Sequence, residues 1–155
     1  MAIWRTLRLL TVAAASFFTS GCATIIGNEL DESGFTELIQ DIAHARCAFR
    51  RGNTNFVPEK PFTSDGCTLW PDGKWRSCCV VHDMDYWCGG SRDARLEADQ
   101  ELRHCVMHFT NDINASLMEL GVRLAGGEIW PTRWRWGYGW PMGAPMERPS
   151  ITSDE

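Results

Sequence analysis

The fold is decided by the stretch Cys78-Cys79-Val80-Val81-His82-Asp83-Met84-Asp85-Tyr86. On a helix, His82 and Tyr86 are four residues apart and share one face, whereas Asp83 points about 100° away from His82. Such a helix presents an imidazole to one region and a carboxylate to the neighbouring region. We predict that it runs from Cys78 to Trp87, because the following pair Gly89-Gly90 is a typical C-terminal stop.

A second helix is predicted only a few residues later. Ser91 is its expected N-cap, and the helix extends at least to Val106. A connection this short makes the two helices antiparallel neighbours, so that Asp99 can approach His82 from the side. A carboxylate bonded to one ring nitrogen leaves the other nitrogen free to take a proton from water. The two residues are therefore a candidate base and its orienting partner, and Tyr86 could donate a hydrogen bond to the same carboxylate.

Cysteines flank this pair of helices. Cys78 precedes His82 by about 6 Å along its helix, and Cys105 follows Asp99 by about 9 Å. Antiparallel packing would place both cysteines at the same end, where a disulfide between them would fix the helix register.

Spacing and composition predict the surrounding elements. Apolar residues recur at helical spacing from Phe35 to Phe49, which predicts a helix there. The segment from Gly52 to Gly73 is rich in Pro, Gly, Asn, Ser and Asp, so we expect a loop. The second helix of the pair either stops near Thr110 or continues to Leu124, and the sequence leaves both possibilities open.

A tryptophan-rich segment follows Gly126-Gly127. One aromatic face is predicted, because four aromatic residues stand at alternate positions: Trp134, Trp136, Tyr138 and Trp140. Trp favours the headgroup region of membranes, so Trp130, Trp134, Trp136 and Trp140 could contact a membrane. Arg133 and Arg135 would add local positive charge. The same face could instead cover the domain core, and both interpretations are open. Residues 141–155 are expected to be a disordered tail.

The N-terminus is typical of an export signal. Arg5 and Arg8 precede an apolar run from Leu9 to Phe18, and small residues follow. The run is shorter than the roughly 20 residues that cross a bilayer. We therefore expect a cleaved signal peptide over residues 1–21.

Cys22 follows Ser20-Gly21 directly, which resembles the lipobox of bacterial lipoproteins. In such proteins the cysteine is acylated and becomes the new N-terminus. We expect a lipidated Cys22, a tether over residues 22–32 and a globular domain over residues 33–140. The protein would then be lipid-anchored in the bacterial cell envelope, and Ala23 suggests delivery to the outer membrane.

Composition limits the function classes. The 155 residues carry 15 basic and 20 acidic side chains, a formal net charge of −5, so no polybasic groove for nucleic acid is expected. Lipidation of one of the seven cysteines leaves six, enough for three disulfides in an exported domain. We expect a monomer.

The run Cys-Cys-x-x-His-Asp-x-x-Tyr, with Asp99 six residues before Cys105, resembles secreted calcium-dependent phospholipase A2. The resemblance covers roughly residues 65–106. It implies hydrolysis of the sn-2 ester of glycerophospholipids at a membrane by an activated water. His82 would be the general base, Asp99 its partner, Tyr86 a donor to Asp99, and Asp83 a bidentate ligand of Ca²⁺.

The resemblance also implies the other metal ligands. They would be backbone carbonyls of the loop beside the first helix, at Gly66, Thr68 and Trp70. Ca²⁺ prefers oxygen donors of this kind. The implied mainly α fold is a disulfide-linked antiparallel helix pair with an N-terminal helix, a metal-binding loop and an irregular aromatic C-terminal segment.

The disulfide pairing follows from the same resemblance. The family pairing implies Cys67–Cys79 and Cys78–Cys105, and it leaves Cys47 for Cys88. The family usually has two further cysteines, bonded to each other, at the positions of Asp85 and Ala98. Neither cysteine is present here, so this disulfide is missing and its loss leaves no unpaired thiol.

Two alternatives remain at this point. A non-catalytic envelope protein could keep the same scaffold and bind lipid or a partner. A structural zinc site could also use thiolates and imidazoles, and the available groups are Cys78, Cys79, His82, Cys88, Cys105 and His108. An exported chain with an even number of thiols argues against zinc.

Overall fold

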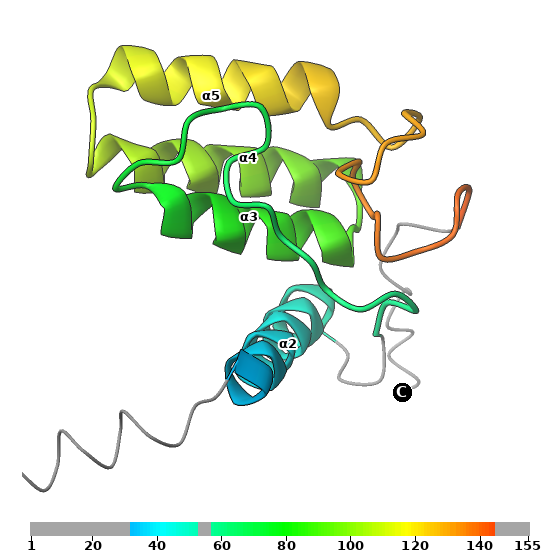
Figure 1. The fold of residues 1–155 in the computed structure, drawn as a ribbon. Coiled ribbons are helices and arrows are strands. Elements are labelled where there is room, and N and C mark those ends of the chain that lie inside the picture. Colours follow the sequence, from blue (N-terminus) through cyan, green and yellow to red (C-terminus); the bar gives the residue numbers. More distant parts are fainter. Residues whose placement is uncertain (1–31, 53–56, 145–155) are drawn as a thin grey trace, which may run out of the picture. The chain divides into compact units, whose positions relative to one another are not determined.

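The structure is a computed structural model that describes residues 32–52 and 57–144 (Figure 1). Within these residues it contains four helices and no strand, which confirms the mainly α class. The helices are α2 (Glu32–Arg51), α3 (Arg76–Cys88), α4 (Arg92–Met107) and α5 (Asp112–Ala125). Among the described helices, none combines the length and apolar character needed to cross a bilayer. The expected signal peptide, the lipidated Cys22 and most of the expected tether and tail lie outside the described residues.

The chain divides into two compact units, residues 1–39 and 40–155. The described part of the first unit is residues 32–39, which form the first turns of α2. The predicted helix over Phe35 to Phe49 is therefore confirmed and extends by a few residues at each end. All residues of the candidate site belong to the second unit.

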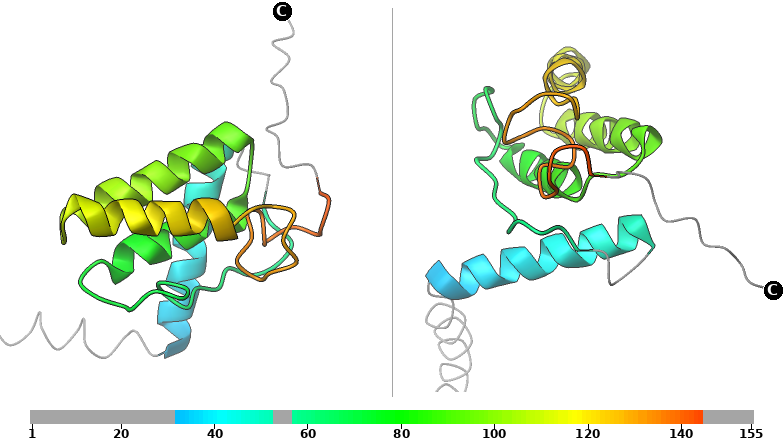
Figure 2. Two further views of the ribbon diagram at one scale, coloured as in Figure 1. Left: turned by 90° about the horizontal axis from the view of Figure 1, so that it is seen from above. Right: turned by 90° about the vertical axis from the view of Figure 1, so that its right-hand side faces the viewer.

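In the second unit, α3, α4 and α5 lie side by side with α4 in the middle (Figures 1 and 2). The short connection from Gly89 to Ser91 makes α3 and α4 antiparallel, as predicted. Gly89 and Gly90 have positive φ angles of 66° and 140°, which residues with a side chain rarely adopt. Ser91 is the N-cap of α4, because its side chain accepts a hydrogen bond from the Ala94 N–H at 3.2 Å.

A separate helix follows α4, which resolves the question that the sequence left open. α4 ends at Met107, and Asn111 caps α5 by accepting a hydrogen bond from the Asn114 N–H at 2.9 Å. Arg103 near the end of α4 pairs with Asp112 at the start of α5. The helices are therefore antiparallel, and the last turn of α5 lies beside the first turns of α4.

The core between these helices is small and apolar. Burying a Leu, Val or Met side chain completely stabilises the fold by about 1.5–3 kcal/mol. The tryptophans of the loop before α3 pack against this core from the side. Its buried members are Cys67, Cys78, Cys79, Leu102, Val106, Ala115 and Met118, with Trp70, Trp75, Cys105 and Val122 packed against them.

Three disulfides connect the elements in the expected pairs. Cys67–Cys79 joins the loop to α3, Cys78–Cys105 joins the start of α3 to the end of α4, and Cys47–Cys88 joins α2 to the end of α3. The six cysteines expected to form disulfides are thus all bonded. No thiolate among them is available for zinc, so the zinc alternative is wrong for these residues.

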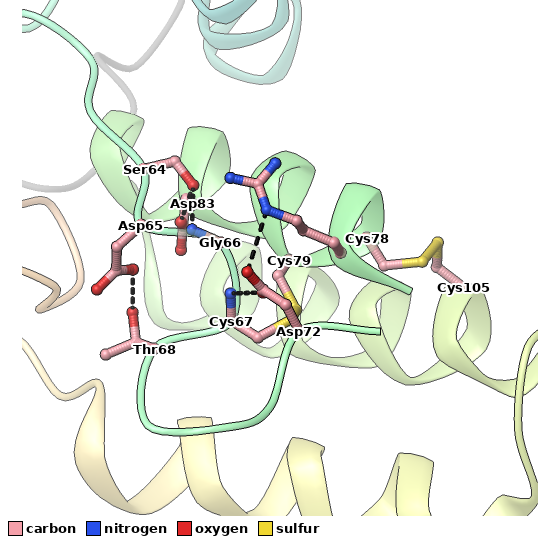
Figure 3. Close-up of a disulfide and its surroundings, with 11 residues drawn as sticks. Ser64, Asp65, Gly66, Cys67, Thr68, Asp72, Cys78, Cys79, Asp83 and Cys105 are labelled. Atoms are coloured by element: carbon pink, nitrogen blue, oxygen red, sulfur yellow. Dashed lines mark hydrogen bonds and ion pairs between the residues drawn. A yellow bond between two sulfur atoms is a disulfide. The ribbon is translucent and has the colours of Figure 1, made fainter. Parts of the chain in front are cut away.

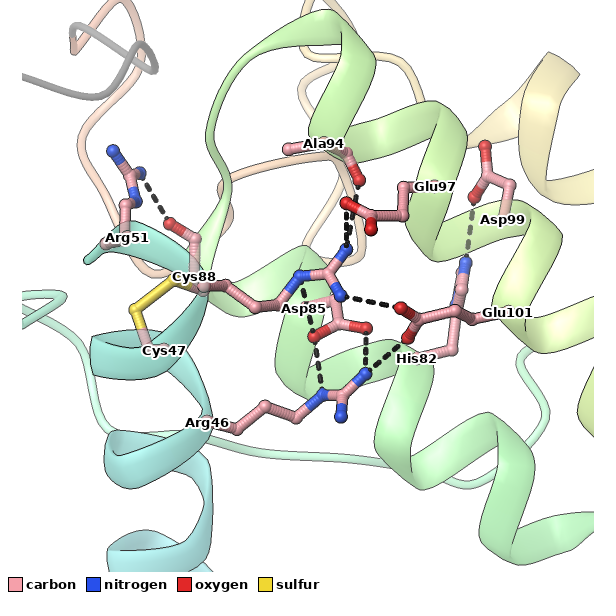
Figure 4. A network of polar contacts seen from close by, with 11 residues as sticks. Arg46, Cys47, Arg51, His82, Asp85, Cys88, Ala94, Glu97, Asp99 and Glu101 are labelled. Carbon is pink, nitrogen blue, oxygen red and sulfur yellow. Dashed lines mark hydrogen bonds and ion pairs between the residues drawn. A yellow bond between two sulfur atoms is a disulfide. The ribbon is translucent and has the colours of Figure 1, made fainter.

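Asp85 on α3 is part of an ionic network (Figure 4). Its carboxylate is 1% exposed and accepts two hydrogen bonds from Arg46, at 2.6 and 2.7 Å. Arg50 lies 3.3 Å from the same carboxylate, and both arginines also pair with Glu101 on α4. The network therefore holds the second half of α2 against α3 and α4.

The tryptophan-rich segment covers the C-terminal end of α3. The Gly137 N–H donates to the Tyr86 carbonyl at 2.6 Å, and the Gly139 N–H donates to the Trp87 carbonyl at 3.2 Å. The indole of Trp140 reaches the Cys88 carbonyl at 2.8 Å. These donors satisfy carbonyls that a helix end otherwise leaves without partners.

The same contacts bear on the two interpretations of the aromatic residues. Trp136 and Tyr138 are buried, 1% and 9% exposed, so this part of the aromatic face covers the core, whereas Trp130 is 47% exposed. Arg135 is also buried, and its guanidinium donates to the carbonyls of Trp136, Gly137 and Trp140. The expectation that Arg135 adds positive charge at the surface is therefore wrong.

Candidate functional site

The candidate base and its partner face each other across the α3–α4 interface (Figure 4). His82 Nε2 lies 2.9 Å from Asp99 Oδ1, and the Tyr86 hydroxyl donates to the same oxygen at 2.8 Å. The rings of His82 and Tyr86 lie next to each other on one face of α3, with centroids 4.3 Å apart and ring planes tilted by 37°. The helical spacing thus brings together the three residues that the sequence analysis selected, and it leaves Nδ1 as the second nitrogen of the imidazole.

Burial and hydrogen bonding act against each other on Asp99. Its carboxylate is completely buried, and desolvation by itself would raise its pKa. The hydrogen bonds from His82, Arg123 and Tyr86 outweigh this effect, so the pKa of Asp99 lies below its ordinary value. Asp99 is therefore an ionised acceptor that can orient the His82 imidazole. Burial and the Asp99 charge raise the pKa of Tyr86, which keeps its hydroxyl a donor.

Two arginines complete this cluster, and the sequence analysis missed both. Arg123 Nη1 on α5 donates to Asp99 Oδ2 at 2.8 Å. Arg95 precedes Asp99 by one turn of α4, and its Nε donates to the Tyr86 hydroxyl at 3.2 Å. The i, i+4 spacing of Arg95 and Asp99 on α4 could have indicated that Arg95 lies beside this cluster. No sequence signal indicates the contact of Arg123 with Asp99, because it depends on how α5 packs.

Asp83 occupies a different environment beside the loop before α3 (Figure 3). The Ser64 hydroxyl donates to Asp83 Oδ2 at 2.6 Å and accepts a hydrogen bond from the Gly66 N–H at 3.1 Å. Desolvation raises the pKa of Asp83 to about 7, although the Ser64 hydrogen bond lowers it. Within the described residues, Asp83 forms no ion pair. Ser64 was not selected from the sequence.

The loop itself is fixed by its own polar contacts. The Cys67 N–H donates to Asp72 at 3.0 Å, and the Thr68 hydroxyl donates to Asp65 at 2.7 Å. Gly66 has a φ angle of 84° and lies against Asp72, so a side chain at this position would be both strained and crowded. The disulfide Cys67–Cys79 joins this loop to α3 one turn before Asp83.

A pocket of about 210 Å³ opens between the loop, α3 and α5. His82, Asp83 and Tyr86 line it from α3, and predominantly apolar side chains form the rest of its wall. The remaining lining residues are Gly66, Cys67, Thr68, Leu69, Trp70, Cys79, Leu102, Met118, Gly121, Val122, Ala125, Gly126 and Trp134. The candidate base, the candidate metal ligand and the three loop positions therefore share one cavity.

Exposed apolar side chains lie on the loop and on α5, two of the elements that line this pocket. Leu69 in the loop is 87% exposed. On α5, an exposed apolar stripe consists of Ile113, Leu117, Leu120 and Leu124, at helical spacing. Gly121 and Ala125 of the same helix line the pocket, so the α5 stripe borders its wall.

The donor set beside the loop fits Ca²⁺. Asp83 is a desolvated carboxylate without an ion pair among the described residues, and the nearby His82 charge offsets its desolvation only in part, so a bound cation would relieve the cost of ionising it. Backbone carbonyls and one carboxylate are ligands that Ca²⁺ accepts. The described residues contain no cluster of three or more His, Cys, Asp or Glu side chains that could hold a metal. The loop carbonyls would therefore have to supply most of the protein ligands.

Comparisons with known proteins add no assignment. No protein-family model, no curated protein and no solved structure matches this chain. Any functional statement therefore rests on the residues and geometry of the site itself.

Proposed function

We propose that this chain hydrolyses the sn-2 ester of glycerophospholipids in a calcium-dependent reaction, as a phospholipase A2-like enzyme. The observation that carries the proposal is the buried Asp99 carboxylate, which accepts hydrogen bonds from His82 and Tyr86 beside a largely apolar pocket. A buried carboxylate is costly without such partners, and an oriented imidazole in a pocket is the usual arrangement of a general base.

The reaction assigns a separate task to each side chain. His82 accepts a proton from water through Nδ1 while Nε2 stays bonded to Asp99, and the water oxygen attacks the ester carbonyl carbon. The proton then passes from His82 to the departing glycerol oxygen, which yields a fatty acid and a lysophospholipid. Asp99 stabilises the imidazolium during this exchange, and Tyr86 keeps the carboxylate in place.

The metal would be held by the Asp83 carboxylate and the carbonyls of Gly66, Thr68 and Trp70. When bound there, Ca²⁺ would offset the negative charge of the substrate phosphate and polarise the ester carbonyl. The apolar wall of the pocket would hold the acyl chains, and the α5 stripe would face the lipid surface from which the substrate comes. An N-terminal lipid anchor at Cys22 in the bacterial envelope remains part of the proposal.

One assay tests this function. Fatty-acid release from mixed phospholipid vesicles should rise with Ca²⁺, fall at least about 1,000-fold in His82→Ala, and stay unchanged in His104→Ala, an exposed histidine of α4. Asp83→Asn should lose the calcium response, and its circular dichroism spectrum should show that it remains folded. Equal release by His82→Ala and the wild type would disprove the proposal.

A second candidate function is lipid binding without catalysis. The exposed apolar residues around the pocket favour it, because they could bind lipid whatever the chemistry of His82. Vesicle binding by the wild type without any calcium-stimulated release would support this alternative.

A further inference from the structure

The two oxygens of the Asp99 carboxylate have different partners. Oδ1 receives the bonds from His82 and Tyr86, both on α3, whereas Oδ2 receives the bond from Arg123 on α5 at 2.8 Å. Asp99 itself is 0% exposed, so bulk water does not replace a missing donor. Arg95 Nε also lies 4.0 Å from Oδ2, which is beyond hydrogen-bond distance, so Arg123 supplies the hydrogen bond to this second oxygen.

The backbone of the last turn of α5, which carries Arg123, is also held in place. Arg95 Nη2 on α4 donates to the carbonyl of Val122 at 3.0 Å and to the carbonyl of Arg123 at 2.8 Å. These carbonyls belong to the last turn of α5, where a helix leaves its acceptors unsatisfied and favours a cation. Because Arg95 also donates to the Tyr86 hydroxyl, one side chain connects the end of α5 to the partners of Asp99.

We propose that Arg123 is a positioning residue of the His82–Asp99 pair, a role that rests on the proposed function. The terminal torsion of an aspartate side chain is broad, so two donors on Oδ1 do not by themselves fix the plane of the carboxylate. Arg123 holds Oδ2, and this keeps Oδ1 directed at His82 Nε2. Arg123 lies outside the segment that resembles phospholipase A2, so α5 supplies a third support for the pair.

The kinetic test compares Arg123→Gln and Arg123→Lys with Arg103→Gln as the matched control. Arg103 is an arginine of α4 whose partners are Asp112 at the start of α5 and Glu119 in its middle. With a soluble short-chain phospholipid and saturating Ca²⁺, Arg123→Gln should lower kcat about 10- to 100-fold, the usual effect of removing a supporting hydrogen bond. KM should change less than about twofold, since Arg123 does not line the pocket. Arg123→Lys should regain most of the rate, and Arg103→Gln should keep it.

A second measurement does not depend on catalysis. The proton shared by His82 Nε2 and Asp99 can be followed by proton NMR and assigned by its absence in His82→Ala. It should broaden or move in Arg123→Gln and remain in Arg123→Lys and Arg103→Gln. Circular dichroism confirms that each variant is folded, and Arg123→Met, which keeps the aliphatic stem, replaces Arg123→Gln if that variant does not fold.

The two measurements separate failure of this inference from failure of the proposed function. If the wild type releases no fatty acid, the proposed function is wrong, and the NMR signal still tests whether Arg123 orders the pair. If the wild type is active but Arg123→Gln keeps both the wild-type kcat and the wild-type signal, Arg123 does not position the pair. A loss of signal and of kcat that Arg123→Lys reverses supports the inference.

Discussion

At the scale of single residues, Asp83 and Asp99 show how the environment separates two carboxyl groups of one site. Asp99 has three hydrogen-bond donors and a lowered pKa. Asp83 has one donor, Ser64, and desolvation raises its pKa to about 7. The first carboxyl group is satisfied by the protein itself, whereas the second one remains available for a cation.

The raised pKa of Asp83 predicts a pH-dependent stability. Between the pKa of the unfolded chain, about 4, and about 7 in the folded protein, the folded state holds a proton that the unfolded chain has lost. Stability is therefore lost as the pH rises through this range. In the presence of a chelator, the free energy of unfolding should fall by about 2–3 kcal/mol between about pH 5 and pH 8. Urea denaturation measures the free energy of unfolding at each pH. In Asp83→Asn its decrease over this pH range should be smaller by about 2–3 kcal/mol. An identical pH dependence in both proteins would contradict this prediction.

Gly126 lies where the last turn of α5 meets Tyr86. A Cβ atom at this position would lie 2.5 Å from Tyr86 Cε1 and 2.8 Å from the Tyr86 hydroxyl. Gly126→Ala should therefore displace Tyr86 and destabilise the protein by about 1–3 kcal/mol. Gly121→Ala is the matched control, because no atom lies within 4 Å of its Cβ. It should be neutral or stabilising by up to about 1 kcal/mol. Urea denaturation compares the two, and equal stability of both variants would argue against the contact.

At the scale of elements, sequence reasoning succeeded where local signals are strong. α3 and α4 were predicted because Gly89-Gly90 and Ser91 mark their junction. α5 was left open, because apolar residues continue at helical spacing on both sides of Asn111. The alternation of aromatic residues suggested one face but gave no information on what it covers. Its role at the end of α3 depends on contacts between residues far apart in the sequence, such as Gly137 with Tyr86.

The same limit applies to the site. His82, Tyr86 and Asp99 could be selected because helical spacing and one short connection determine how they meet. The selection of Gly66, Thr68 and Trp70 rested on a resemblance, and their role as ligands stays a prediction. The contacts of Ser64 and Arg123 depend on loop conformation and on helix packing, and neither leaves a signal in the sequence. The motif therefore identified the residues that meet at the candidate site but only some of the residues that support them.

The ionic network around Asp85 predicts how α2 is held. Removing Arg46 leaves the buried carboxylate with Arg50 alone, so Arg46→Met should cost about 3 kcal/mol. Arg103→Met is the control, because its partner Asp112 is exposed, and it should cost less than about 1 kcal/mol. Thermal or urea denaturation measures both variants. A loss for Arg46→Met no greater than for Arg103→Met would show that the network does not hold α2.

At the scale of the whole molecule, the net charge and the exposed apolar side chains have different consequences for binding to a lipid surface. The formal net charge of −5 does not favour binding to anionic lipids. Contact with a lipid surface would therefore have to come from apolar side chains. The α5 stripe supplies them next to the pocket, with Leu120 and Leu124 53% and 69% exposed.

Replacing this apolar surface should weaken vesicle binding. In a protein with Cys22→Ser, so that no acyl anchor masks the effect, Leu120→Ser combined with Leu124→Ser should reduce affinity for neutral phospholipid vesicles at least about tenfold. Leu96→Ser is the control, a leucine of α4 that is 40% exposed and does not line the pocket. Vesicle sedimentation measures both. Equal binding by the double variant and the control would exclude the α5 stripe as the lipid-binding surface.

The support that α5 and the final turns give to the helix pair limits how far the chain can be shortened. A fragment that stops after Cys105 would include every residue of the recognisable motif, yet Asp99 would lose Arg123 and the last carbonyls of α3 would lose their donors. Grafting the motif onto an unrelated two-helix hairpin would fail for the same reason. The smallest piece able to support the proposed chemistry would have to reach Trp140, well past Asp99, the last side chain of the proposed catalytic pair.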